Sequence, residues 1–100
     1  MSGEAKSSKA AGYRLRLVVA GSTDRSRRAI ENLRKICNAH LDKQVDLEVI
    51  DIFQQPDLAE KYQVVAAPTL VKLLPPPIRR IIGDLAQEDR VLRGLDIEPL

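Results

Sequence analysis

The residues that could do chemistry in this sequence are few and scattered. There is one cysteine, Cys37, and one histidine, His40. Thiol–disulfide exchange needs one thiolate to attack and a second thiol to resolve the mixed disulfide, so dithiol chemistry is excluded. Cys37 falls on an apolar helical stripe, which favours a packed structural thiol over a reactive one. His40 comes late in the same stretch and is typical of a solvent-edge or helix-end residue favoured by the helix dipole.

The acidic and hydroxyl residues do not complete a catalytic or metal site either. Asp46, Glu48 and Asp51 lie on or just after an expected strand, without a partner nucleophile or a metal-ligand spacing. Ser22 and Thr23 precede an expected helix and could hold an anion there, but capping of that helix is the favoured role. We therefore predict no catalytic residue, no metal, no cofactor and no enzymatic activity.

Composition restricts the class of protein further. One hundred residues with 44% hydrophobic and 30% charged residues suit a single globular domain. The formal charge of +2 and only three aromatic residues argue against a nucleic-acid binder. No apolar stretch is long enough for a membrane span, and the polar opening MSGEAKSSKAAG has no signal-peptide core. We expect a cytoplasmic protein without membrane contact, and the small size makes self-association energetically useful.

The first half of the chain predicts a β-strand, a helix and a second strand. Residues 1–12 have no apolar period and are expected to form a flexible leader. Residues 13–20 and 45–52 favour strands, and Ser22 or Thr23 caps the helix between them. A right-handed crossover would make the two strands parallel. The helix carries one apolar stripe: Ala29, Ile30, Leu33, Ile36, Cys37 and Leu41.

The second half is ambiguous. Residues 56–62 predict a short helix with proline in its first turn, and residues 63–74 suit either a strand or a helix. The prolines at 75–77 must interrupt regular structure, and residues 78–85 fit a helix or a hairpin strand. Asp84 and Gln87 resemble a capping box for a last helix over 85–93, which Gly94 would end in the left-handed conformation.

This order of elements, βαβαββα, is that of the thioredoxin fold. Ala67-Pro68-Thr69 stands where that fold keeps a cis-proline before its third strand. The loop at 21–26, where thioredoxins carry their cysteine pair, contains no sulfur. Arg79 and Arg80, after the proline turn, form a candidate exposed basic patch for an acidic partner surface.

Three segments carry a resemblance to a known family: VAGST, VIDIFQQPDLAEKYQVVAAPTLVKLLPPPIRRIIGDL and VLRGLDI. They resemble the KaiB family of circadian clock proteins, and the match defines a domain over 13–97 and a tail over 98–100. The family is described as metamorphic, which implies an alternative ground-state fold for residues 63–95. That implication agrees with the ambiguity of the same residues.

The resemblance implies a regulatory function. KaiB-type proteins bind the N-terminal ATPase ring of a KaiC-type protein, and in cyanobacteria the assembled ring captures KaiA and competes with an output histidine kinase. KaiC is therefore the expected partner, with KaiA or a histidine kinase as further partners and a dimer or tetramer as the expected self-association. The alternative is a KaiB-like sensory domain of a KaiC-interacting histidine kinase.

The resemblance also implies roles for single residues. Tyr13, Arg28 and Lys72 match positions implicated in folding state or partner contact. Gly94 and Asp96 match the segment whose substitution biases the fold switch, and Pro68 matches a proline thought to set its geometry.

Three departures from the cyanobacterial pattern accompany these matches. Gln54 replaces a usual lysine, Val18 replaces a tyrosine, and the sequence lacks an acidic tail after Leu100. They imply a KaiB outside the full oscillator, working with KaiC alone in timing or stress adaptation.

Overall fold

The computed structural model describes residues 12–41 and 45–97, so most of the expected leader (1–12) and the whole tail (98–100) lie outside the described residues. A four-stranded sheet has the order β2-β1-β3-β4. Its strands are β1 (Tyr13–Val19), β2 (Val45–Asp51), β3 (Thr69–Leu74) and β4 (Arg79–Ile82). β1 and β2 are parallel, as predicted, and the β1–β3 and β3–β4 pairs are antiparallel.

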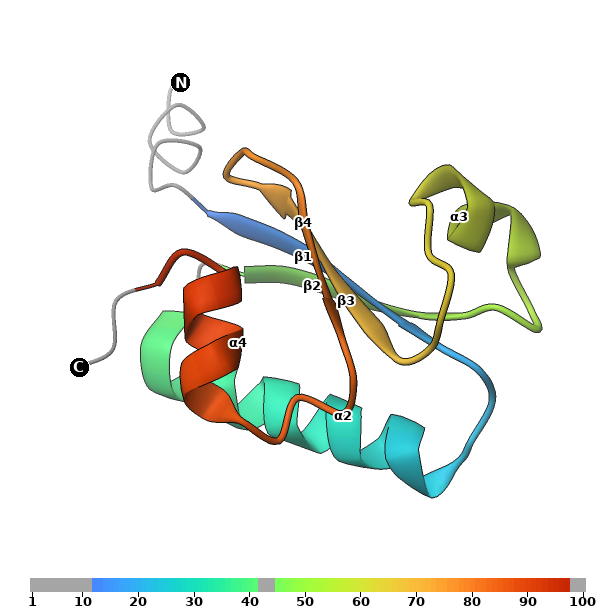
Figure 1. Ribbon diagram of the computed structural model, residues 1–100, viewed down its shortest axis with the longest axis horizontal. Helices are drawn as coiled ribbons and strands as arrows, with labels where there is room; N and C mark the ends of the chain where they lie inside the picture. Colours follow the sequence, from blue (N-terminus) through green and yellow to red (C-terminus); the bar gives the residue numbers. More distant parts are fainter. Residues whose placement is uncertain (1–11, 42–44, 98–100) are drawn as a thin grey trace.

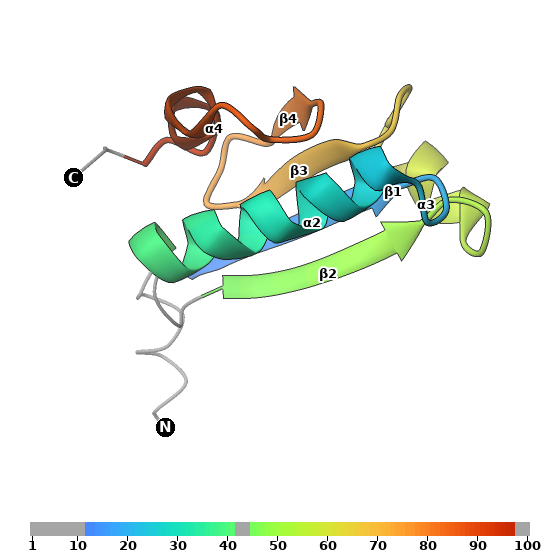
Figure 2. The same cartoon turned by 90° about the horizontal axis from the view of Figure 1, so that it is seen from below.

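The helices cover the sheet unequally. They are α2 (Asp24–Ile36), which continues into the π-helical turn η1 (Cys37–Leu41), α3 (Pro56–Lys61) and α4 (Glu88–Gly94). In Figure 1, α2 runs along the sheet and α4 stands across it near the η1 end of α2, while α3 stands apart at the far end of the sheet. Figure 2 shows the same separation from below. None of these helices is long and apolar enough to cross a bilayer, within the residues described.

The hydrophobic core lies between the sheet and the α2–α4 pair. Alternate residues of β1 point into it, and the apolar stripe of α2 packs against them. Thr23 caps α2 as predicted, because its side-chain oxygen accepts a hydrogen bond from the Ser26 amide at 3.1 Å. The buried residues of this cluster come from β1, β3, β4, the two covering helices and the turns beside them: Leu15, Leu17, Val19, Ala29, Leu33, Ile36, Cys37, Leu70, Ile81, Leu85, Val91, Leu92 and Leu95. β2 adds the partly buried Val45 and Leu47 to its edge.

The structure resolves the ambiguity of the second half in favour of a β-hairpin. β3 and β4 pair from Thr69↔Ile82 to Lys72↔Arg79, and the three prolines form the bend between them. The peptide bond before Pro68 is cis, as predicted, and those before Pro75 and Pro77 are cis as well.

The predicted capping box was wrong. α4 begins at Glu88, three residues later than expected, and the Gln87 side chain makes no capping hydrogen bond. Asp84 instead closes a local turn, because its Oδ1 accepts from the Ala86 amide at 3.1 Å. Leu85 then adopts φ +63°, outside the helical region, and its side chain is buried in the core. Burial of Leu85 thus competes with an earlier helix start.

Candidate partner-binding and switch site

A buried lysine organises the end of the domain. Lys72 lies on the core face of β3, and its side chain has 0% solvent exposure. Its ammonium donates to the Pro75 carbonyl and to Oδ2 of Asp96, both at 2.8 Å. Arg79, opposite Lys72 on β4, donates to the same Oδ2 at 3.0 Å. A buried charge must be paired and hydrogen-bonded to be tolerated, and this arrangement does both.

Tyr13 joins this group from the start of β1. Its hydroxyl donates to the Leu95 carbonyl at 3.1 Å, so β1, β3 and β4 all hold the segment that follows α4. We call Tyr13, Lys72, Arg79, Leu95 and Asp96 the Asp96 cluster. Burial, and then the charge of Asp96, raise the pKa of Tyr13. Hydrogen bonds from Lys72 and Arg79 lower the pKa of Asp96.

Gly94 lies beside the Asp96 cluster for a reason that differs from the predicted one. It is the last residue of α4, and the left-handed residue after the helix is Asp96, at φ +61°. A Cβ on Gly94 would lie 2.5 Å from Cδ1 and 2.8 Å from Cγ1 of Ile81. Glycine is therefore needed for the close approach of α4 to β4, and the predicted left-handed ending at this residue was wrong.

Lys72 cannot touch a partner in this arrangement, because its ammonium is enclosed. Two roles were expected for Lys72, in the folding state or in partner contact. Its contacts are consistent with the first, because they join the hairpin to the segment after α4. Direct contact of Lys72 with a partner protein is not possible while the hairpin is formed. Tyr13, Lys72, Arg79, Gly94 and Asp96 thus come together at one end of the sheet. The other predicted site residues lie elsewhere.

Arg79 and Arg80 do not form one basic patch. Both are exposed, as predicted, but neighbouring residues of a strand point to opposite faces of the sheet. Arg79 faces Asp96 after α4. Arg80 faces the end of α3, where its Nε donates to the Tyr62 carbonyl at 2.9 Å and its Nη2 to Oε1 of Gln63 at 3.2 Å. The hypothesis of a joint patch was therefore wrong.

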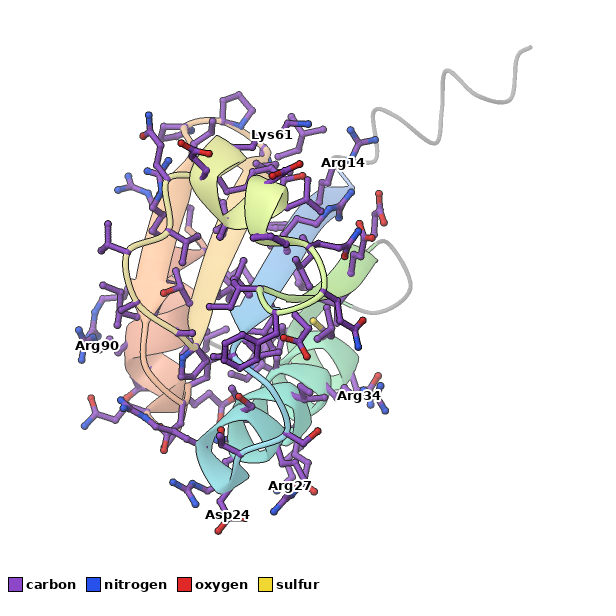
Figure 3. All side chains as sticks on the ribbon, turned by 90° about the vertical axis from the view of Figure 1, so that its right-hand side faces the viewer. Arg14, Asp24, Arg27, Arg34, Lys61 and Arg90 are labelled. Atoms are coloured by element: carbon purple, nitrogen blue, oxygen red, sulfur yellow. The ribbon has the colours of Figure 1, made fainter. Side chains whose placement is uncertain are left out.

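The remaining predicted residues are separate. Arg28 is exposed on α2, and its Nε lies 3.5 Å from Oδ2 of Asp84. Gln54 is exposed after β2 and lines an open groove with the start of α2. Pro68 is buried, and its carbonyl accepts from the Gly83 amide at 2.9 Å. Figure 3 looks onto the side of the molecule where Arg14, Arg27 and Lys61 project into solvent.

The side chains that could have been reactive or metal-binding have structural roles instead. Cys37 is packed in the core as predicted, and burial raises its pKa to about 11. Asp51 accepts hydrogen bonds from the Gly21 and Phe53 amides at 3.2 and 2.9 Å, which fixes the turn after β2. Within residues 12–41 and 45–97, no group of three His, Cys, Asp or Glu side chains could hold a metal ion.

His40 is more enclosed than the sequence suggested. Its side chain is only 8% exposed, so of the two predicted positions the solvent edge was wrong. The helix-end position is confirmed, because His40 lies in the last turn of η1, which ends at Leu41. Its Nε2 lies 2.7 Å from Oε2 of Glu88, 48 residues away, and this contact joins η1 to the start of α4. A single sequence offers no signal for such a long-range pair.

The chain is similar to proteins of one known family along most of its length. Residues 16–97 match the family model of the KaiB domain. The chain is 47% identical to circadian clock protein KaiB3 of Synechocystis sp. over 85 residues, covering 85% of this chain and 83% of the relative. It is 52% identical to the circadian clock oscillator protein KaiB of Synechococcus sp. (strain RCC307), covering 85% and 77%.

Solved structures agree on the fold. The N-terminal domain of Synechococcus elongatus SasA matches with a TM-score of 0.69 and 25% identity, covering 85% of this chain and 84% of that domain. Mitochondrial thioredoxin 3 of Saccharomyces cerevisiae matches with a TM-score of 0.68 and 21% identity, covering 84% and 76%. The fold is thioredoxin-like, and the family match extends through the hairpin and α4. The chain therefore belongs to the KaiB family.

Proposed function

We propose that this protein is a non-catalytic regulator that binds the N-terminal ATPase ring of a KaiC-type protein and modulates its phosphorylation and ATPase cycle. The observation that carries the proposal is the family match over residues 16–97, which includes nearly every described element. Relatives that are 47% and 52% identical are named as circadian clock proteins. Action through a surface also fits a fold whose only thiol is buried in the core.

The thioredoxin-like form is the one proposed to bind the ring. Residues 63–95 are proposed to exchange with a second packing, so that the ring selects one form through differential affinity. Non-glycine residues with positive φ in the described residues are Gln63, Leu85 and Asp96, all in or next to this region. The Asp96 cluster connects the end of this region to β1, so we propose that its contacts stabilise the form that binds the ring.

Direct test of the proposal requires the KaiC homologue of the same organism. The two purified proteins are mixed with ATP or ADP and separated by size-exclusion chromatography with light scattering. Co-elution of a complex larger than the free ring, in at least one nucleotide state, is the expected result. Separate elution in every nucleotide and phosphorylation state rejects the proposal.

A matched pair of variants tests the surface. Arg28 and Arg34 are both exposed on α2, and each substitution by glutamate changes the charge equally. We expect Arg28→Glu to weaken co-elution and Arg34→Glu to leave it unchanged. Gln54→Lys, which restores the usual family residue, should strengthen it.

A second candidate is a KaiB-like sensory domain of a KaiC-interacting histidine kinase. The structural match to the SasA N-terminal domain favours it, but that identity is 25%, against 47% and 52% for the KaiB proteins. The two candidates differ in fold switching. Backbone chemical shifts that report one fold for residues 63–95 under all conditions would favour the sensory domain.

A further inference from the structure

A groove lies where the start of α2, the end of β4 and the start of α4 meet. It encloses about 230 Å³ and does not include any residue of the Asp96 cluster. Its lining comes from three segments that are distant in sequence: Arg25, the stretch 81–87, and Arg90 with Val91. We propose that this groove binds an acidic segment of a partner protein, with a carboxylate of that segment held by Arg25 and Arg90.

The floor of the groove is apolar. Ile81, Leu85 and Val91 line it, and each is at most 9% exposed, because their side chains also belong to the core. Ile82 also lines the groove and is 52% exposed. A site with an apolar floor and charged groups at its edge suits a peptide that alternates acidic and apolar residues.

The charges of the groove are unbalanced in favour of cations. Arg25 and Arg90 both line it, and neither forms a salt bridge with a carboxylate within residues 12–41 and 45–97. Asp84 is an acidic residue of the lining, and its carboxylate already has two partners: Arg28, which lies outside the groove, and the Ala86 amide. In Figure 3, Arg90 projects outward from α4 into solvent.

The neighbouring acids do not compensate the two guanidinium groups. Glu88 turns toward His40, and Asp24 pairs with Arg27. Asp89 is exposed and does not line the groove. Guanidinium groups bind carboxylates through paired, charge-assisted hydrogen bonds. Two such groups, with no carboxylate partner in the part of the chain that the structure describes, beside an apolar floor therefore indicate an acidic ligand.

The binding test needs no ATPase ring, so its result is independent of the function proposed above. The probe is a fluorescein-labelled peptide, DLEVDE, and the control peptide is NLQVNQ, which keeps the apolar residues and removes the charges. Fluorescence anisotropy measures affinity at several salt concentrations. We expect saturable binding of DLEVDE that weakens with salt, and no binding of NLQVNQ.

Variants identify the groove as the site. Arg25→Gln combined with Arg90→Gln should weaken DLEVDE binding about tenfold or more, since two charge-assisted contacts are lost. The control combines Arg34→Gln with Arg93→Gln, which removes the same charge from exposed positions of the same two helices outside the groove. This control should retain binding within about twofold. Circular dichroism checks that both double variants are folded.

Backbone amide shifts supply the second readout. The Gly83 and Ala86 signals should move on addition of DLEVDE, because both residues line the groove. Absence of saturable binding overturns the proposal, and so does equal weakening by the two double variants, which would mean general attraction between charges. Shifts at Gly83 and Ala86 that follow protein concentration without peptide also overturn it, because a second copy would then be the occupant.

Discussion

Two substitutions of Lys72 separate the contribution of its buried stem to stability from the contribution of its charge. Its stem is fully buried on the core face of β3, while its ammonium reaches Asp96 and the Pro75 carbonyl. Lys72→Ala removes both and leaves a cavity, so the free energy of unfolding should fall by about 2–4 kcal/mol, as for truncation of a buried methionine. Lys72→Met keeps the stem. Asp96 remains exposed and paired with Arg79, so we expect a change of less than about 1.5 kcal/mol.

Acid titration of the same variants tests the charge. Since Lys72 and Arg79 lower the pKa of Asp96 below 3.8, the folded state binds this proton less readily than the unfolded state. The resulting stability is present above pH 3.8 and is lost as pH falls through the folded pKa. Lys72→Met removes the largest cause of the lowered pKa, so its stability should fall less steeply in that range.

Urea unfolding followed by circular dichroism, at pH 7 and at several values below pH 4, measures both effects. Chemical shifts of the β3–β4 hairpin check that each variant starts from the thioredoxin-like form. If Lys72→Met costs as much as Lys72→Ala, the ammonium and not the stem holds the hairpin. The reasoning given for the Asp96 cluster would then be wrong.

Three further predictions concern the packing around the sheet. Gly94→Ala should destabilise the protein by about 1 kcal/mol less in an Ile81→Val background than in the wild type, because Ile81→Val removes Cδ1, the atom closest to the new Cβ. A double-mutant cycle of urea unfolding measures this coupling, and additive free energies of unfolding would contradict it. Tyr13→Phe should lower the free energy of unfolding by about 0.5–1.5 kcal/mol through loss of the hydrogen bond to the Leu95 carbonyl. An unchanged urea midpoint would show that this hydrogen bond does not stabilise the fold. The buried thiol of Cys37 should contribute stability that is complete below pH 9 and is lost as pH rises through about 11; denaturation curves parallel to those of Cys37→Ala over that range would refute it.

The first half of the fold was predictable because its determinants are local. Thr23 stands before a regular apolar stripe, and the flanking strands are rich in β-branched residues, so β1, α2 and β2 follow from short-range patterns. Residues 78–85 could not be assigned in this way. Their helical spacing is overridden by pairing of β4 with the preceding strand β3, and the helical and strand patterns of this short apolar run are equally good in the sequence alone.

The candidate site was predicted only in part. The family resemblance selected Tyr13, Lys72, Gly94 and Asp96, but the reason for each is tertiary. Burial of Lys72 is tolerated through a carboxylate 24 residues away, and Gly94 is required by a side chain of β4. The groove between Arg25 and Arg90 depends on the turn at Asp84, which the sequence pattern interpreted as the cap of a helix starting at Leu85.

The central claim is that the KaiC-type ring binds the thioredoxin-like form. Magic-angle-spinning NMR of carbon-13-labelled protein, sedimented with its unlabelled ring, tests this claim most directly. The account predicts strand chemical shifts for residues 69–74 and 79–82 and helical shifts for 88–94 in the complex. Helical shifts at 79–82 in the complex would contradict it.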